Sequence, residues 1–322
     1  MTEAAPYQQD TKEGAELPRG APTGQVNDPS YKTKRNETVP VVDDDAPLEG
    51  RGLGKADSDA QLGMVLRSLS ILAFVARGVF AHGGLSNYTV GDTWYSGYDP
   101  FTPAAAQLSQ PWLIQRQWTS IDPLFSPTSP YLACNFPGTA PPSYIPLRAG
   151  DILTAVYWFW LHPVGPMSVW LARCAGDCRD EDVTRARWFK IWHAGLLEGP
   201  NLELGMWYQK KFQRWDGGPA LWPVRIPRGL KKGLYMVRHE ILSIHVGGRP
   251  QFYPECAHLN VTEGGEVVVP EEWTRRFPGA YDDDDESVFI DIYRPEYENR
   301  TDYEVPGGPI WEGLGEIELW PE

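Results

Sequence analysis

The chain has 322 residues, and its 43 acidic side chains outnumber 29 basic ones, which gives a formal net charge of -14. This length allows one large β-domain with tails or two ordinary domains. The negative charge argues against a nucleic-acid partner, because binding to phosphates needs clustered Lys and Arg side chains. An uncharged or crystalline substrate fits the charge balance better.

The N-terminal part of the sequence predicts a leader and a secretory signal. Residues 1–63 are mostly polar and poor in large apolar groups, so we expect them to be disordered. Residues 64–81 combine a basic start, an apolar run and the small-residue end Val79-Phe80-Ala81, as a signal peptide does. Cleavage after Ala81 exposes His82, and residues 1–63 are then a removed leader or an artefact of gene prediction. The alternatives are a buried strand or a membrane anchor, but the apolar run is short for a bilayer span.

The chain after His82 contains short segments that are rich in aromatic and β-branched residues and are bounded by Gly or Pro. They predict strands at 152–161, 167–173, 233–246, 266–269 and 287–293, and one short helix is expected at 188–197. Together with the loop-rich stretch 83–129, this pattern predicts an all-β fold: an antiparallel β-sandwich of immunoglobulin or fibronectin III type with long decorating loops. We expect the domain to cover residues 82–311, with a tail at 312–322.

Cysteine usage indicates an oxidising compartment. All four cysteines fall between Cys134 and Cys256, and an even count suits two disulfides. The alternative is a zinc site, since Cys174 and Cys178 have ligand-like spacing, but no second such pair accompanies them. Three sequons, which suit a secreted glycoprotein, stand at Asn87, Asn260 and Asn299.

Two histidines predict a metal site. A free His82 terminus would offer an amine and an imidazole to one metal ion, and His162, at the end of an apolar segment, is the best candidate for a third nitrogen. Planar nitrogen donor sets select Cu(II). Either histidine alone is more often a structural residue, so the prediction depends on their combination.

A second cluster is Gln251-Phe252-Tyr253-Pro254-Glu255-Cys256. Side chains alternate faces in an extended chain, so Gln251 and Tyr253 should project together while Phe252 enters the core. This suits a phenol at an axial metal position with an amide beside it. Upstream, His239 lies in an apolar strand, where its imidazole needs a hydrogen-bond partner. An ordinary buried polar pair is the alternative interpretation of His239 and Gln251.

These motifs resemble the lytic polysaccharide monooxygenases of auxiliary activity family 9, formerly filed as glycoside hydrolase family 61. The resemblance runs from His82 to about Pro309 and includes, in order, the histidine after the signal, His162 running into Gly165-Pro166, Arg238-His239-Glu240-Ile241, the 251–257 cluster, and Phe277-Pro278-Gly279-Ala280-Tyr281. The chain departs from the common pattern in having two residues, Pro163 and Val164, before Gly165.

The resemblance implies one copper ion held by His82 and His162, with Tyr253 as the axial ligand. It implies that His239 and Gln251 hydrogen-bond an oxygen species near the metal. It also implies the disulfides Cys134–Cys256 and Cys174–Cys178.

The implied activity is oxidative cleavage of cellulose or a related β-1,4-glucan at C1 or C4, with O2 or H2O2 as co-substrate. The implied electron donor is cellobiose dehydrogenase or a small reductant, and we expect a secreted monomer with neither a membrane nor a nucleic-acid partner. Candidate sugar-stacking residues are Tyr88, Tyr297 and Tyr303, although core packing is the commoner fate of a tyrosine.

Two rival functions remain at this point: a non-catalytic carbohydrate-binding sandwich and a zinc hydrolase. The zinc hydrolase would need three protein ligands and a general base, and no HExxH motif is present. The acidic run 282–286 is interpreted as a solvated loop rather than a calcium site.

Overall fold

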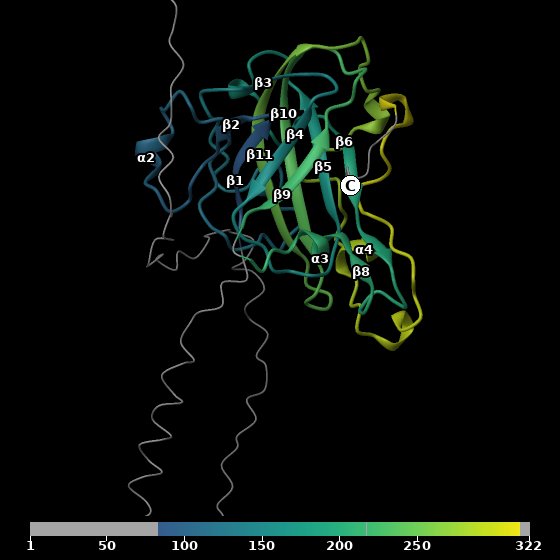
Figure 1. The fold of residues 1–322 in the computed structure, drawn as a ribbon. Helices are drawn as coiled ribbons and strands as arrows, with labels where there is room; N and C mark the ends of the chain where they lie inside the picture. The colour runs from purple at the N-terminus through teal and green to yellow at the C-terminus, as the bar shows by residue number, and fades with distance from the viewer. Residues whose placement is uncertain (1–82, 217, 316–322) are drawn as a thin grey trace, which may run out of the picture.

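The computed structural model describes residues 83–216 and 218–315, and it shows two β-sheets packed face to face (Figure 1). The first sheet has the strand order β2 (Thr93–Ser96), β1 (Leu85–Val90), β4 (Ile152–Tyr157), β9 (Ala220–Arg225). The second has the order β3 (Ile145–Arg148), β11 (Gln251–Glu263), β10 (Gly233–Ser243), β5 (Met167–Arg173), β6 (Trp188–Ala194). A short pair joins β7 (Leu196–Glu198) to β8 (Met206–Trp207). The predicted β-sandwich is therefore confirmed.

The strands of both sheets are antiparallel except for the parallel pair β3 and β11. The predicted leader, the predicted signal peptide, His82 and residues 316–322 of the predicted tail lie outside the described residues. No helix in the described ranges is long and apolar enough to cross a bilayer.

The core between the two sheets is dominated by aromatic and branched side chains. Tyr157 and Trp222 from the first sheet are fully buried there together with Val169 and Ile241 from the second. Because side chains alternate along a strand, β10 and β11 each direct one set of residues into this core and the other set outward.

The outward set of the second sheet is also buried, because long loops cover it. Trp170, Phe252, Phe277 and Tyr281 form a second apolar cluster there. Arg238 lies in this layer with its guanidinium carbon 3.7 Å from the centre of the Phe277 ring. The Pro- and Gly-rich loops therefore form a third packed layer on the outer face of the second sheet.

Helices are short and lie at the periphery. Within residues 83–216 and 218–315, the α-helices are α2 (Ala104–Gln107), α3 (Tyr208–Phe212) and α4 (Glu286–Phe289), and the 3-10 turns are at Pro130–Leu132, Cys178–Asp180, Glu271–Trp273, Pro295–Tyr297 and Glu312–Leu314. Both implied disulfides are present, Cys134–Cys256 and Cys174–Cys178, so the alternative of a cysteine zinc site is excluded.

Three predicted elements were wrong. The segment 188–197 is not a helix but mostly strand β6, because its Trp, Phe and Ile side chains are buried on both faces of the sheet. The segment 287–293 is not a strand, since Asp285 accepts a hydrogen bond from the Ser287 amide and starts the helical turn α4. The segment 266–269 is not a strand and makes one isolated bridge, between Val267 and Leu230.

The C-terminal segment, yellow in Figure 1, runs beside β6 and is held there by a buried lysine. Lys190 of β6 is 2% exposed, and its ammonium group donates to the carbonyl oxygens of Pro306 (2.9 Å) and Gly308. The same nitrogen lies 4.9 Å from the centre of the Trp170 ring. An ammonium group with several acceptors can tie an irregular segment to a sheet edge.

Candidate metal site

The candidate site lies at one end of the sandwich, where β4 and β10 end and β5 and β11 begin. His162 stands in the connection from β4 to β5, between Tyr157 and Met167. The connection needs Gly165, which has a φ of +130° and whose side chain, if it had one, would meet the Leu242 carbonyl oxygen at 2.0 Å. Val164, one of the two residues between His162 and Gly165, has a carbonyl oxygen that accepts a hydrogen bond from the Ile244 amide at 3.1 Å. The turn is therefore aligned with the end of β10.

Strand β11 brings Gln251 and Tyr253 to the same place. The Tyr253 hydroxyl lies 3.1 Å from the Gln251 side-chain oxygen, while Phe252 points to the other face and is fully buried. The predicted alternation along this segment is therefore confirmed.

His162 and Tyr253 converge on each other. The His162 Nε2 atom lies 3.1 Å from the Tyr253 hydroxyl oxygen, and both side chains are 5% exposed. Burial raises the pKa of Tyr253, and the charge of Asp122 raises it further, so the phenol stays neutral. An imidazole nitrogen and a neutral phenol oxygen facing the same space can ligate the same ion.

Trp160 fixes the orientation of both groups. Its ring packs edge-on against Tyr253, with ring centres 4.8 Å apart, and against His162 at 5.2 Å. The indole nitrogen donates to Gln209 at 3.3 Å. Trp160 and Gln209 are buried, so the two candidate ligands have little rotational freedom.

His245 is a site residue that the sequence-based prediction missed. It lies in the hairpin between β10 and β11, and its ring stacks on His162 with centres 4.5 Å apart. Its Nδ1 atom is 2.6 Å from the Ser243 hydroxyl, which fixes the ring. Ser243 pairs with Gln251 across the hairpin, so residues near this turn lie beside the 251–253 cluster.

The structure does not bring His239 to this cluster. His239 pairs with Glu255, four residues farther along β11 than Gln251, which corresponds to roughly 13 Å of strand. Its ring is fully buried between the sheets, 3.2 Å from the Tyr88 hydroxyl and 5.0 Å from the Trp222 ring centre. Burial lowers its pKa to about 3, so the imidazole is neutral. It matches the alternative interpretation, a buried polar core residue.

The three tyrosines predicted to stack on sugar lie in different environments. Tyr88 is fully buried. Tyr303 is half-buried, with its hydroxyl on the Ser287 carbonyl oxygen and its ring 4.8 Å from the centre of Trp207. Tyr297 is half-buried and donates to Glu286 at 3.1 Å. By contrast, Tyr293 is 53% exposed, and its hydroxyl donates to the His245 carbonyl oxygen at 2.9 Å.

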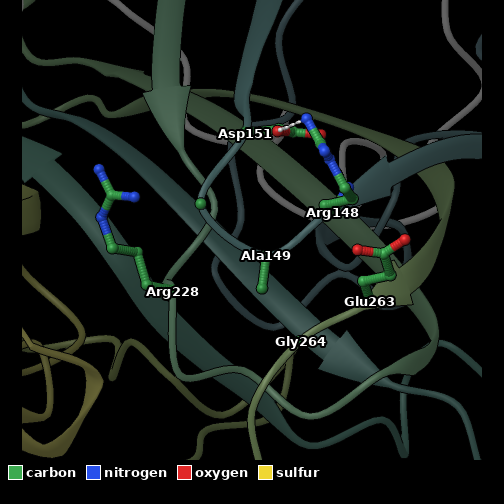
Figure 2. A pocket seen from close by; sticks show the side chains of 7 residues that line it. Arg148, Ala149, Asp151, Arg228, Glu263 and Gly264 are labelled. Atoms are coloured by element: carbon green, nitrogen blue, oxygen red, sulfur yellow. Dashed lines mark hydrogen bonds and ion pairs between the residues drawn. The ribbon is translucent and has the colours of Figure 1, made fainter.

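Two other features can be separated from the site. Among the described residues there is no group of three His, Cys, Asp or Glu side chains that could hold a metal, and the predicted acidic run 282–286 is largely exposed. Figure 2 shows a charged hollow in which Arg148 turns toward Asp151 and Arg228 lies on the opposite side. This hollow includes Glu263, at the far end of β11 and roughly 40 Å along the strand from Gln251.

Comparison with known proteins identifies the family. The chain matches the family described as Auxiliary Activity family 9 (formerly GH61) over residues 82–303. It is 37% identical over 248 residues to AA9 family lytic polysaccharide monooxygenase B of Heterobasidion irregulare, covering 76% of this chain and 98% of that protein. The chain belongs to auxiliary activity family 9.

Solved structures agree with this auxiliary activity family 9 assignment. The crystal structure of HiLPMO9B is similar with a TM-score of 0.65 and 36% identity, covering 72% of this chain and 100% of that one. The structure of a cellulose-active polysaccharide monooxygenase from M. thermophila is similar with a TM-score of 0.66 and 33% identity, covering 71% and 99%. As a lytic polysaccharide monooxygenase, the protein is an oxidoreductase that cleaves polysaccharides, in a family of copper enzymes.

Proposed function

We propose that the mature protein begins at His82, binds one copper ion, and cleaves cellulose or a related β-1,4-glucan oxidatively at C1 or C4. The observation that carries the proposal is the convergence of His162 Nε2 and the Tyr253 hydroxyl, 3.1 Å apart, in a chain whose family match begins at residue 82. The proposed catalytic domain covers residues 82–311, preceded by a removable leader (1–63) and signal peptide (64–81).

The donor set fits copper. His162 offers an imidazole nitrogen and Tyr253 a neutral phenol oxygen, and a free His82 terminus would add an amine and a second imidazole. Nitrogen donors of this kind, with an oxygen donor beside them, suit Cu(II), so His82, His162 and Tyr253 would hold the ion. Bound copper would supply one-electron chemistry with O2 or H2O2, using electrons from a reductant such as cellobiose dehydrogenase.

The residues around the ligands have separate proposed roles. Gln251 accepts the Tyr253 hydrogen bond and presents its amide group beside the ligands. We assign to His245, rather than to His239, the role of holding an exchangeable proton near the metal, because His245 stacks on His162. Residues that surround metal ligands in this way orient them and tune the metal, and their loss lowers metal affinity or activity.

The polysaccharide would bind over the exposed rim of this end of the sandwich. Tyr293 has an exposed ring whose hydroxyl is anchored at His245, so a sugar stacked on it would lie next to the ligands. We propose that Tyr297 and Tyr303, which are half-buried, contact the polysaccharide only at the edge of this surface. Tyr88 is fully buried and cannot contact a polymer. Aromatic faces bind the apolar faces of sugars, and a surface site suits a crystalline substrate.

The proposal is tested with secreted protein whose N-terminus has been determined. After loading with one equivalent of copper, incubation with cellulose and ascorbate should give aldonic or C4-oxidised oligosaccharides in mass spectra. Binding to cellulose without oxidised products on any glucan would favour the non-catalytic alternative. The same preparation tests the expected monomeric state by size-exclusion chromatography.

A further inference from the structure

Glu255 is a buried carboxyl group to which the proposed chemistry gives no role. It lies on β11 two residues after Tyr253, so both side chains point into the space between the sheets. Its side chain is 4% exposed. Burial of a carboxyl group costs free energy unless it is hydrogen-bonded, so its contacts reveal what it holds.

One partner of Glu255 is the backbone at the start of β1; the other is the Tyr157 hydroxyl, and both hydrogen bonds lower the pKa that burial raises. The Glu255 Oε2 atom accepts a hydrogen bond from the Leu85 amide at 2.9 Å. The Leu85 carbonyl oxygen accepts a hydrogen bond from the Gln115 side-chain amide at 3.1 Å. The Gln115 side-chain oxygen in turn accepts a hydrogen bond from the Tyr98 amide at 2.8 Å. Gln115 and Leu85 are both fully buried. The side chains of Glu255 and Gln115 therefore hold Leu85 by both of its backbone polar groups, the amide and the carbonyl.

Side chains take this role because the strand pairing is irregular here. The register between β1 and β4 shifts between Leu85 and Asn87, where the ladder is interrupted. A buried amide without a ladder partner must be paired in another way. Glu255 belongs to the other sheet, so this hydrogen bond also connects the two layers of the sandwich.

The two residues before Leu85 leave the chain little freedom. A side chain at Gly83 would meet the Phe159 carbonyl oxygen at 1.5 Å, and one at Gly84 would meet the Trp118 ring at 2.2 Å. The backbone thus passes closely between Phe159 and Trp118. Three residues span at most about 10 Å, so a shift at Leu85 would be passed on to the position of His82.

We propose that Glu255 and Gln115 are positioning residues that fix Leu85 so that the His82 terminus reaches the space shared by His162 and Tyr253. This inference rests on the proposed function, in which His82 is a copper ligand. Strand β11 then positions both groups of proposed ligands. Its Tyr253 faces His162, and its Glu255 holds the segment that follows His82.

The test compares Glu255→Met, which removes the acceptor at similar length, with Glu255→Gln, which keeps an oxygen that can accept from Leu85. In protein starting at His82, Glu255→Met should weaken Cu(II) binding by about 10- to 100-fold and change the electron paramagnetic resonance spectrum. Glu255→Gln should restore both the affinity and the spectrum. Hydrogen exchange at the Leu85 amide should accelerate in the Met variant and stay slow in the Gln variant.

The matched control is Val237→Ala, a fully buried core change on the neighbouring strand β10. It should lower stability and leave copper affinity unchanged. Equal copper affinity and spectra in Glu255→Met and the unsubstituted protein, or a loss no larger than in Val237→Ala, would overturn the inference. If Glu255→Met does not fold, Gln115→Met is tested by the same measurements, and it should weaken copper binding in the same way. Failure of the unsubstituted protein to bind copper would instead contradict the proposed function.

Discussion

His245 and His239 lie six positions apart on the same hairpin arm, and the described contacts bring His245 against His162. The sequence shows the right residue types but not their register. Once a hairpin is placed between 246 and 251, the histidine nearest the turn must lie beside Gln251, whereas one in mid-strand lies roughly 13 Å away. The motif Arg238-His239-Glu240-Ile241 points to His239, whereas proximity to the hairpin turn points to His245.

Substitution of these two histidines separates their roles. We expect His245→Gln to lower the rate of oxidised-product formation by about 10- to 100-fold with little change in copper affinity. His239→Gln should lower stability, because it disturbs the contacts with Tyr88 and Trp222, and leave the rate per copper-loaded molecule unchanged. Initial rates by product mass spectrometry and copper affinity by calorimetry check both. A large loss of rate in His239→Gln with an unchanged rate in His245→Gln would assign the role of holding a proton near the metal to His239.

Tyr253→Phe tests whether the Tyr253 hydroxyl would ligate copper. The ring can keep its packing on Trp160, so the expected loss of stability is only about 1 kcal/mol for the hydrogen bonds removed. The electron paramagnetic resonance spectrum of bound Cu(II) should change, because one oxygen donor is lost. An unchanged spectrum would mean that the hydroxyl is not a ligand.

At the scale of elements, hydrophobic and β-branched runs located β4, β5 and β10, and the alternating pattern at 251–256 located the start of β11. The misassigned elements have a common cause. Trp188–Ala194 is buried on both faces, so it lacks the alternation that distinguishes a strand from a helix. Val288 and Ile292 are apolar because they enter the second cluster under the loops, not because they join a sheet. Such tertiary burial cannot be derived from local composition.

The two disulfides should differ in their contribution to stability. Cys134–Cys256 closes a separation of 122 residues and Cys174–Cys178 one of 4. In the chain-entropy model, replacing the first pair with alanines costs about 4 to 5 kcal/mol and replacing the second about 2 kcal/mol. Urea unfolding of the two double variants measures this. Equal losses would contradict the assumption that loop length controls stability here.

For the whole molecule, buried histidines should set the acid limit of stability. Burial lowers the pKa of His193 to about 4, of His239 to about 3, and of His258 well below its usual value. Between pH 6.5 and 4 these groups take up protons in the unfolded chain but not in the folded one. Stability therefore falls as pH falls, by about 1 kcal/mol per pH unit for each histidine.

Glu255 opposes this trend. Burial raises its pKa to about 8, so the folded carboxyl keeps a proton that the unfolded chain releases, and its contribution declines as pH rises from about 4.5 to 8. Three histidines outweigh one carboxyl below pH 6.5. We expect the unfolding free energy to drop from pH 6.5 to 4.5, and His239→Gln to reduce the slope by about 1 kcal/mol per pH unit. Tyr88→Phe, which keeps the imidazole, is the control with an unchanged slope.

The central claim is that a terminal His82 completes a copper site with His162 and Tyr253. It is tested most directly by titrating Cu(II), followed by electron paramagnetic resonance, into protein beginning at His82 and into protein that retains Ala81. We predict one equivalent of tightly bound type 2 Cu(II) in the first and loss of that spectrum in the second. The same spectrum and affinity in both proteins would contradict the claim.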